Sequence, residues 1–290
     1  MESPLLQFQE IGKVYLNNKG RKYAVLEGFN LSISKGEFIS VIGHSGCGKS
    51  TVLMMAAGLT EITSGYIFLK SQQIDGPGPD RGVVFQSPSL LPWLSGFDNV
   101  MLGVNKVYPH GTKKQREDIA KFYINRVGLL ENMNQRAADL SSGMKQRVAI
   151  ARAFALKPKV LLLDEPFGML DSMTRAELQE VLMEVWSKEK ITAMLVTHDI
   201  DEALFLSDRV VMMTNGPKAR VGDVLHVPFA RPRLKKEVIE HPDYYKCRGY
   251  LTDFLEGEDH SIQKVLKDVL ENKKKENSSE NDDRVVLLTT

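Results

Sequence analysis

One stretch of the sequence, VIGHSGCGKST at residues 41–51, constrains the fold of this chain more than any other. The apolar run FISVIG at residues 38–43 is typical of a buried strand, and STVLMMAAG at residues 50–58 is typical of a helix. Between them the residues follow the pattern G-x-x-x-x-G-K-S, from Gly43 to Ser50. Such a pattern between a strand and a helix predicts a loop that folds around phosphate groups.

The chemistry of this loop supports the phosphate prediction. Glycines let backbone N–H groups turn inward toward phosphate oxygens, and the following helix directs the positive end of its dipole at the same place. Lys49 is expected to reach the terminal phosphates, and the Ser50 hydroxyl to bind Mg²⁺. The alternative is a glycine-rich turn that only caps a helix. The residues expected to contact the phosphates are Gly43, His44, Ser45, Gly46, Cys47, Gly48, Lys49, Ser50 and Thr51.

A phosphate loop alone does not choose among kinases, GTPases and ATPases, whereas a second feature, VLLLDEP at residues 160–166, does. A buried strand that ends in a carboxylate would place Asp164 beside the phosphate loop, where it can hold the Mg²⁺ shell. Glu165 is one residue further on and is the candidate general base for an attacking water. The alternative is a pair of solvated acids at a strand end.

The composition narrows the class of protein. The 38 Lys and Arg residues nearly balance the 37 Asp and Glu, so the net charge of +1 gives no reason to expect a nucleic-acid partner. Cys47 and Cys247 are too few for a disulfide framework and fit a reducing compartment. No apolar run reaches membrane-spanning length, and MESPLLQFQE lacks the features of a secretory signal. We therefore expect a soluble chain that can still associate with a membrane protein.

Strand and helix patterns alternate along the chain, which predicts an α/β fold with a parallel core. Residues 5–42 read as short strands, and LLQFQEIGKVYL at 5–16 and FNLSI at 29–33 alternate as half-buried antiparallel strands do. The segment ENKKKENSSENDDR near the C-terminus has no apolar face and is expected to be disordered. The other expected helices lie at 112–129, 144–156, 173–189 and 199–207, and the other expected strands at 159–165, 192–198 and 208–214.

A third motif opens the expected helix at 144–156 and identifies a family. Together with the phosphate loop and LLLDEP, this motif resembles the ATP-binding-cassette ATPases, whose signature is usually Leu-Ser-Gly-Gly-Gln. Here the signature is Leu140, Ser141, Ser142, Gly143 and Met144. Ser142 in place of the first glycine departs from the family; we expect the change to be tolerated, with slowed hydrolysis as the alternative.

The resemblance implies a domain plan. It implies a P-loop NTPase fold at residues 5–235, with a RecA-like parallel core, an antiparallel β subdomain and a helical signature subdomain at about 88–156. Residues 236–256 are expected to form a C-terminal extension packed on this domain, and 257–290 a charged, disordered tail.

The resemblance also implies further site residues and a mechanism. Gln86 matches the glutamine that senses Mg²⁺ and water, Asp171 the aspartate at the dimer seam, and His198 the switch histidine. Tyr15 matches the aromatic residue against adenine, with Tyr23 as its rival. Two cassettes are expected to face each other head to tail with two ATP molecules between them, each signature contacting the nucleotide of the other subunit. The implied catalytic residues are Glu165, His198 and Gln86, and the implied Mg²⁺ ligands are Ser50, Gln86 and Asp164.

The segment SPSLLPWLSGF at residues 87–97 suggests what such a motor drives. It is apolar in a region expected at the surface, a feature of interfaces. The resemblance implies that residues 87–104 contact a membrane permease subunit. The alternative is that Trp93 folds back into the helical subdomain.

A finer resemblance rests on GHSGCGKS, PGPDRGVVFQSPSLLPW, VPFARPR and HPDYYKCRGYLTDFL. These segments are similar to the importer ATPases for nitrate, bicarbonate, sulfonate and taurine, above all to nitrate and bicarbonate members of cyanobacterial type. The resemblance implies nitrate as the imported anion, with bicarbonate, sulfonate or taurine as alternatives. It also implies two permease subunits, an anion-binding protein and a place on the cytoplasmic face of the inner membrane. The second ATPase subunit is expected to be a longer paralogue, with an identical chain as the alternative.

Functions of other classes are disfavoured. Soluble cassette ATPases of ribosomes or DNA repair commonly carry two cassettes or long inserted arms, which this chain lacks. A GTPase would need an Asn-Lys-x-Asp motif, and neither NKVY nor NKKK supplies its aspartate. A binding module without hydrolysis is disfavoured by the presence of both Glu165 and His198.

Overall fold

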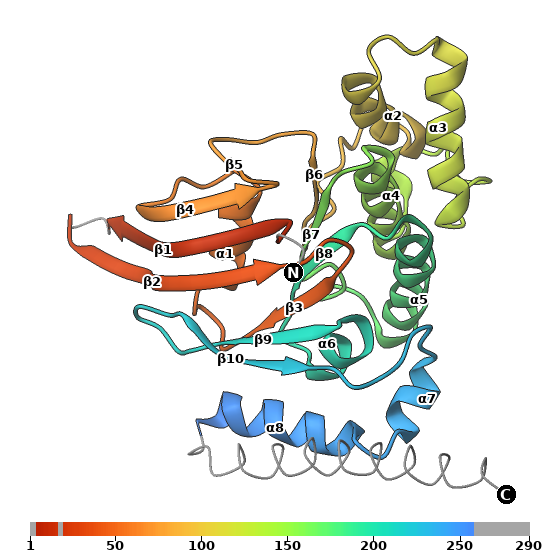
Figure 1. The fold of residues 1–290 in the computed structure, drawn as a ribbon. Helices are drawn as coiled ribbons and strands as arrows, with labels where there is room; N and C mark the ends of the chain where they lie inside the picture. Colours follow the sequence, from red (N-terminus) through yellow and green to blue (C-terminus); the bar gives the residue numbers. More distant parts are fainter. Residues whose placement is uncertain (1–3, 17–19, 258–290) are drawn as a thin grey trace, which may run out of the picture.

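Two β-sheets with helices packed around them make up the part of the chain that the structure describes (Figure 1). A computed structural model describes residues 4–16 and 20–257. The expectation of a disordered tail therefore falls, apart from Gly257, outside the described residues. The expected α/β fold with a parallel core, an antiparallel sheet and a helical part is confirmed.

The larger sheet holds the strands that lead to the site. Its order is β10-β9-β3-β8-β7-β6, and β10 alone of these strands runs antiparallel to its neighbour. The carboxyl ends of β3, β8, β7 and β6 therefore meet at one edge, where ligands of open α/β sheets bind. The strands are β3 Phe38–Ile42, β6 Arg81–Val84, β7 Val160–Asp164, β8 Thr192–Val196, β9 Arg209–Met213 and β10 Val221–His226.

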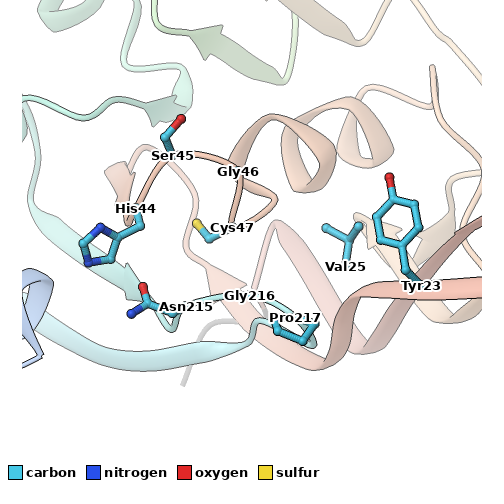
Figure 2. Close-up of a pocket in the computed structure, with 9 residues that line it drawn as sticks. All are labelled: Tyr23, Val25, His44, Ser45, Gly46, Cys47, Asn215, Gly216 and Pro217. Atoms are coloured by element: carbon cyan, nitrogen blue, oxygen red, sulfur yellow. The ribbon is translucent and has the colours of Figure 1, made fainter. Parts of the chain in front are cut away.

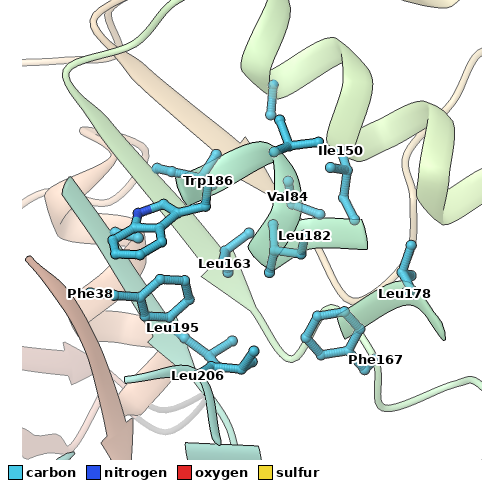
Figure 3. Packing of buried hydrophobic residues seen from close by; sticks show 14 of the residues in the cluster. Phe38, Val84, Ile150, Leu163, Phe167, Leu178, Leu182, Trp186, Leu195 and Leu206 are labelled. Carbon is cyan, nitrogen blue, oxygen red and sulfur yellow. The ribbon is translucent and has the colours of Figure 1, made fainter. Parts of the chain in front are cut away.

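The central strands are buried on both faces, which explains their continuous apolar sequences. Along β7, Leu161 and Leu163 pack into one hydrophobic cluster, and Val160 and Leu162 into the other. The first cluster lies under the helices, where Phe38 meets Trp186 at 5.4 Å between ring centroids in an edge-to-face contact (Figure 3). Both faces of the sheet are thus held in place by apolar packing, which fixes the strand ends that carry polar side chains.

The smaller sheet is antiparallel, with the order β2-β1-β4-β5. Its strands are β1 Leu6–Leu16, β2 Lys22–Ile33, β4 Ser64–Leu69 and β5 Gln72–Gln73. The half-buried antiparallel strand expected at 5–16 corresponds to β1, whereas the strand expected at 29–33 is only the end of β2, which is continuous over 12 residues. Register shifts interrupt their pairing, so the apolar residues do not alternate regularly along either strand.

The helices divide by position. Helices α2, α3 and α4 pack on one another in the helical part, whereas α5 and α6 cover the larger sheet (Figure 1). Helix α8 packs on α6 and α7. The helices are α1 Lys49–Ala56, α2 Gly96–Val107, α3 Lys113–Arg126, α4 Ser142–Ala155, α5 Ser172–Glu189, α6 Ile200–Leu206, α7 Lys235–Glu240 and α8 Tyr244–Glu256, with a 3₁₀ turn η1 at Ala137–Asp139. No helix among the described residues is long and apolar enough to span a membrane.

Candidate nucleotide site

The glycine-rich loop connects β3 to α1 at the carboxyl edge of the larger sheet. Gly48 caps α1 with a φ of 106°, and a Cβ at this position would lie 2.8 Å from the Val25 side chain. Only glycine therefore fits there without strain. The Lys49 side chain is buried, and its Nζ donates hydrogen bonds to the carbonyls of Gly43 at 2.8 Å and His44 at 3.0 Å. The lysine ammonium thus lies within the loop that leads to it.

A cavity of about 390 Å³ is lined in part by this loop (Figure 2). Its wall combines residues of the loop with residues of β2 and of the turn between β9 and β10. The N-terminus of α1 follows the loop, and its backbone N–H groups and positive dipole end favour an anionic ligand beside the loop. The lining residues are Tyr23, Val25, His44, Ser45, Gly46, Cys47, Asn215, Gly216 and Pro217.

The Cys47 thiol points into the protein rather than into the cavity's solvent. Its side chain is buried, and a Cβ added to Gly43 would lie 2.9 Å from its Sγ. Burial raises the pKa of the Cys47 thiol, while the nearby Lys49 lowers it less. Cys47 therefore shapes the loop as a small apolar side chain.

Ser50 and Asp164 join the loop to the end of β7. The Ser50 Oγ donates a hydrogen bond of 2.8 Å to Asp164 Oδ1. Burial raises the pKa of Asp164, and the hydrogen bond from Ser50 opposes that shift. Two hard oxygen donors side by side suit Mg²⁺, which takes one or two protein oxygens and completes its shell with phosphate and water. Among the described residues no group of three His, Cys, Asp or Glu side chains could hold a metal ion by itself.

Glu165 follows Asp164 on a sharp turn. Its φ of 43° lies in the left-handed region, which a glutamate adopts at a cost of about 1–3 kcal/mol. Its Oε2 lies 3.3 Å from His198 Nδ1 and 3.4 Å from Gln86 Nε2, which donates a hydrogen bond to it. The structure thus brings together three residues that the sequence predicted for hydrolysis, from the ends of β7, β8 and β6.

Asp171 and Asp199 organise the segments beside this group. Asp171 caps α5 by accepting hydrogen bonds from the backbone N–H groups of Met173 and Thr174, and these bonds lower its pKa. Asp199, next to His198, caps α6, and its Oδ2 lies 3.4 Å from Nη1 of Arg175 on α5. This ion pair links the Asp171 segment to the His198 segment. Sequence reasoning missed it, because neither residue belongs to a motif that spacing reveals.

The signature residues begin α4. Ser141 caps the helix by accepting a hydrogen bond of 3.3 Å from the Met144 backbone N–H, and both Ser141 and Ser142 are exposed. Gly143 is buried, and a Cβ there would lie 2.5 Å from Thr174 on α5. In the described part of the chain no hydrogen bond joins this helix start to the loop at 43–48. Leu140 is buried and packs in the helical core.

The two candidate aromatic residues face each other across β1 and β2. Tyr15 pairs with Tyr23 in the register, and their rings stack at 5.9 Å between centroids. Tyr23 lines the cavity, whereas Tyr15 is half-buried with Lys13 Nζ 4.7 Å from its ring centroid. Of the stacked pair, Tyr23 is the ring that lines the cavity, and Tyr15 is its neighbour on β1.

The segment after Gln86 exposes an aromatic side chain. Trp93 is 68% exposed, so it does not fold back into the helical part. Arg152 on α4 holds the start of the segment by donating hydrogen bonds of 3.0 Å to the carbonyls of Pro88 and Ser89. Burial lowers the pKa of this guanidinium. The exposed tryptophan thus sits on a segment that is fixed from beneath.

A phosphate loop, acids at the end of a neighbouring parallel strand, and a helix start with a Leu-Ser-Ser-Gly signature define an ATP-binding cassette. A family model described as ABC transporter matches residues 26–168. The bicarbonate transport ATP-binding protein CmpD of Synechococcus elongatus is 50% identical over 252 residues, covering 87% of this chain and 90% of the relative. This chain belongs to the ATP-binding proteins of the ABC transporter family.

Two further relatives and one solved structure are also similar to this chain. The nitrate import ATP-binding protein NrtD of S. elongatus is 51% identical over 86% of this chain and 91% of its own. The bicarbonate transport ATP-binding protein CmpC of Synechocystis is 52% identical over 84% of this chain but only 37% of its own. The dimeric ATP-binding cassette MJ0796 bound to ADP and Pi matches with a TM-score of 0.69 and 29% identity, over 78% of this chain and 100% of that one.

Proposed function

We propose that this chain is the ATP-hydrolysing subunit of a membrane importer for a small inorganic anion, with nitrate as the first candidate. One observation carries the hydrolytic part of the proposal. His198 Nδ1 and Gln86 Nε2 both approach the Oε2 oxygen of Glu165. Glu165 directly follows Asp164, which accepts a hydrogen bond from Ser50 at the end of the phosphate loop. A carboxylate between two polar side chains, next to a phosphate cradle, is equipped to orient and deprotonate a water.

Each residue of the site has a proposed role. The loop at 43–51 binds the phosphates through its N–H groups, and Lys49 supplies positive charge at their end. Glu165 accepts the proton of the attacking water, while His198 and Gln86 hold the carboxylate and the water in position. Ser50 and Asp164, with Gln86, would hold Mg²⁺, which when bound neutralises charge on the phosphates. Tyr15 is proposed to stack on adenine.

A second ATPase subunit completes the proposed site. The exposed Ser141 and Ser142 at the start of α4 present backbone N–H groups that this chain's own loop does not use. They are proposed to contact the nucleotide of the partner subunit, across a seam that includes Asp171. A longer paralogue is the proposed partner, since one bicarbonate relative of this chain is much longer than the region it shares. Residues 5–235 are proposed as the ATPase domain, with a helical subdomain at about 88–156 and an extension at 236–256.

The exposed Trp93 supports a membrane partner. An exposed tryptophan on a braced segment has the character of an interface anchor. Residues 87–104 are proposed to contact a permease subunit on the cytoplasmic face of the inner membrane. An anion-binding protein would deliver the anion on the other side.

The anion is proposed from the relatives, and bicarbonate is the second candidate. Relatives named for the two anions match this chain equally well, so similarity does not separate them. The ATPase subunit is expected not to contact the anion, so its own site carries no preference.

Reconstitution tests the function. The complex that co-purifies with this chain is placed in liposomes with the matching binding protein, and phosphate release is measured with nitrate, bicarbonate, sulfonate or taurine in turn. Stimulation by nitrate alone is expected. Stimulation by bicarbonate alone would replace the anion but keep the importer. Activity indifferent to every anion, with no co-purifying membrane subunit, would overturn the importer in favour of a soluble ATPase.

A further inference from the structure

Helix α8 is anchored to the body of the protein along its length. Near its start, Tyr244 donates a hydrogen bond of 2.8 Å from its hydroxyl to Asp201 on α6, and Arg248 Nε donates to the same carboxylate oxygen at 2.9 Å. Half-way along, the Tyr250 hydroxyl donates to Asp223 on β10. These bonds fix the position of α8 relative to β10 and α6. Helix α6 begins close to His198.

The last turn of α8 reaches the nucleotide site. The Phe254 ring lies against Gly222 of β10, where an added Cβ would come within 2.5 Å of the ring. The next residue, Leu255, has its carbonyl in a hydrogen bond with Nε2 of His44. His44 is the second residue of the glycine-rich loop and lines the cavity beside it (Figure 2). A segment more than 200 residues away in the sequence thus contacts the loop directly.

The end of a helix is suited to this contact. The last carbonyls of a helix lack partners within it and carry the negative end of its dipole, so they attract an N–H donor. The Gly257 N–H bonds to the carbonyls of Asp253 and Phe254, which leaves the Leu255 carbonyl for His44. Nε2 of His44 is therefore the donor, and the carbonyl the acceptor.

The contact continues into the loop through the backbone. The His44 carbonyl accepts a hydrogen bond of 3.0 Å from Nζ of Lys49, the cation of the phosphate loop. One residue therefore receives α8 through its side chain and Lys49 through its main chain. A movement of His44 would shift the acceptor that holds Lys49.

We propose that His44 is a positioning residue that braces the glycine-rich loop on the end of α8, so that docking of α8 sets the affinity of the loop for nucleotide. The proposal rests on the proposed function only in that the loop binds nucleotide. It gives the segment 244–256 a role in nucleotide binding although this segment contacts no phosphate. Displacement of α8 is therefore expected to weaken nucleotide binding even when the cavity itself is unchanged.

Two histidine substitutions test the brace. Gln can place an amide N–H where Nε2 of His44 lies, whereas Ala cannot. His44→Ala is expected to weaken binding of the fluorescent nucleotide mant-ATP about five- to tenfold, and to raise KM by more than it lowers kcat, since the loss is one of binding. His44→Gln is expected to restore most of the affinity. Equal losses in both variants, or no loss in His44→Ala, would overturn the brace.

A variant at the other end of the contact completes the test. Phe254→Ala loosens the last turn of α8 without altering the loop, and it is expected to weaken mant-ATP binding in the wild-type background but not further in His44→Ala. Additive losses would contradict coupling through this contact. The control is Phe122→Ala, an exposed phenylalanine of α3, which should leave binding unchanged. If the wild-type chain itself fails to bind mant-ATP, the proposed function fails; if only the His44 effects are missing, the brace alone fails.

Discussion

The Ser50 hydroxyl donates a hydrogen bond of 2.8 Å to the Asp164 carboxylate, across 114 positions of sequence. This bond ties the first turn of α1 to the end of β7 and aligns two oxygen ligands that suit Mg²⁺. The pair is expected to make nucleotide binding depend on Mg²⁺.

Replacing the carboxylate tests that dependence. Asp164→Asn keeps the shape and an acceptor for Ser50 but removes the charge, so the gain in mant-ATP affinity on adding Mg²⁺ should fall about tenfold or more. Titration with and without EDTA measures it. Asp118→Asn, at an exposed aspartate of α3, is the matched control. A full Mg²⁺ effect in Asp164→Asn would remove this residue from the metal shell.

The stacked pair Tyr15 and Tyr23 allows adenine recognition to be assigned. Stacking on a base contributes about 1–3 kcal/mol, so Tyr15→Ala should weaken mant-ATP binding about tenfold, and Tyr15→Phe should not. Tyr23→Ala is expected to have the smaller effect. Since Tyr23 lines the cavity, the reverse order would transfer the role to it.

Trp93 is predicted to act only in the assembled importer. Trp93→Ala should leave ATP hydrolysis by the isolated chain unchanged, because the side chain is exposed. Co-purification of membrane subunits should fall, as for a tryptophan anchor at an interface. Tyr66→Ala, at an exposed aromatic residue of β4, is the control. Undiminished co-purification in Trp93→Ala would contradict the proposed permease contact.

Glu202 on α6 makes stability depend on pH. It is 5% exposed and accepts a hydrogen bond of 3.0 Å from Gln179, and burial raises its pKa from 4.5 to about 7. Between pH 4.5 and about 7 the folded protein keeps a proton on Glu202 that the unfolded chain has released. The contribution of this group to the free energy of unfolding is therefore fully present below pH 4.5 and is lost as pH rises through about 7. The contribution lost over this window is about 3 kcal/mol.

Chemical unfolding across the window checks this sign. The free energy of unfolding of Glu202→Gln, which cannot ionise, should fall less than that of the wild type between about pH 5 and pH 7.5. Glu180→Gln, at an exposed glutamate of α5, should follow the wild type. Parallel curves for the wild type and Glu202→Gln would show that burial does not hold the proton.

The sequence predicted those parts of the site that local pattern determines. The glycine loop and the apolar strands before Lys49 and Asp164 could be predicted because spacing and burial of short segments determine them. The full length of β2 could not, because register shifts in its pairing with β1 hide its alternation. Contacts made by tertiary structure were also out of reach: the Arg175–Asp199 pair and the bond between His44 and Leu255 join residues with no pattern in common. Nor does a run such as DIDEALFLS reveal that Glu202, and not a neighbouring acid, is the buried one.

The measurement that tests the central claim most directly is ATP turnover of Glu165→Gln beside the wild type. Loss of the general base should lower phosphate release about a hundredfold or more, while mant-ATP still binds. With hydrolysis blocked, size exclusion in ATP should show a dimer that ADP does not support. Turnover within about twofold of the wild type, with no ATP-dependent dimer, would contradict the account of Glu165 as the catalytic base of a cassette ATPase.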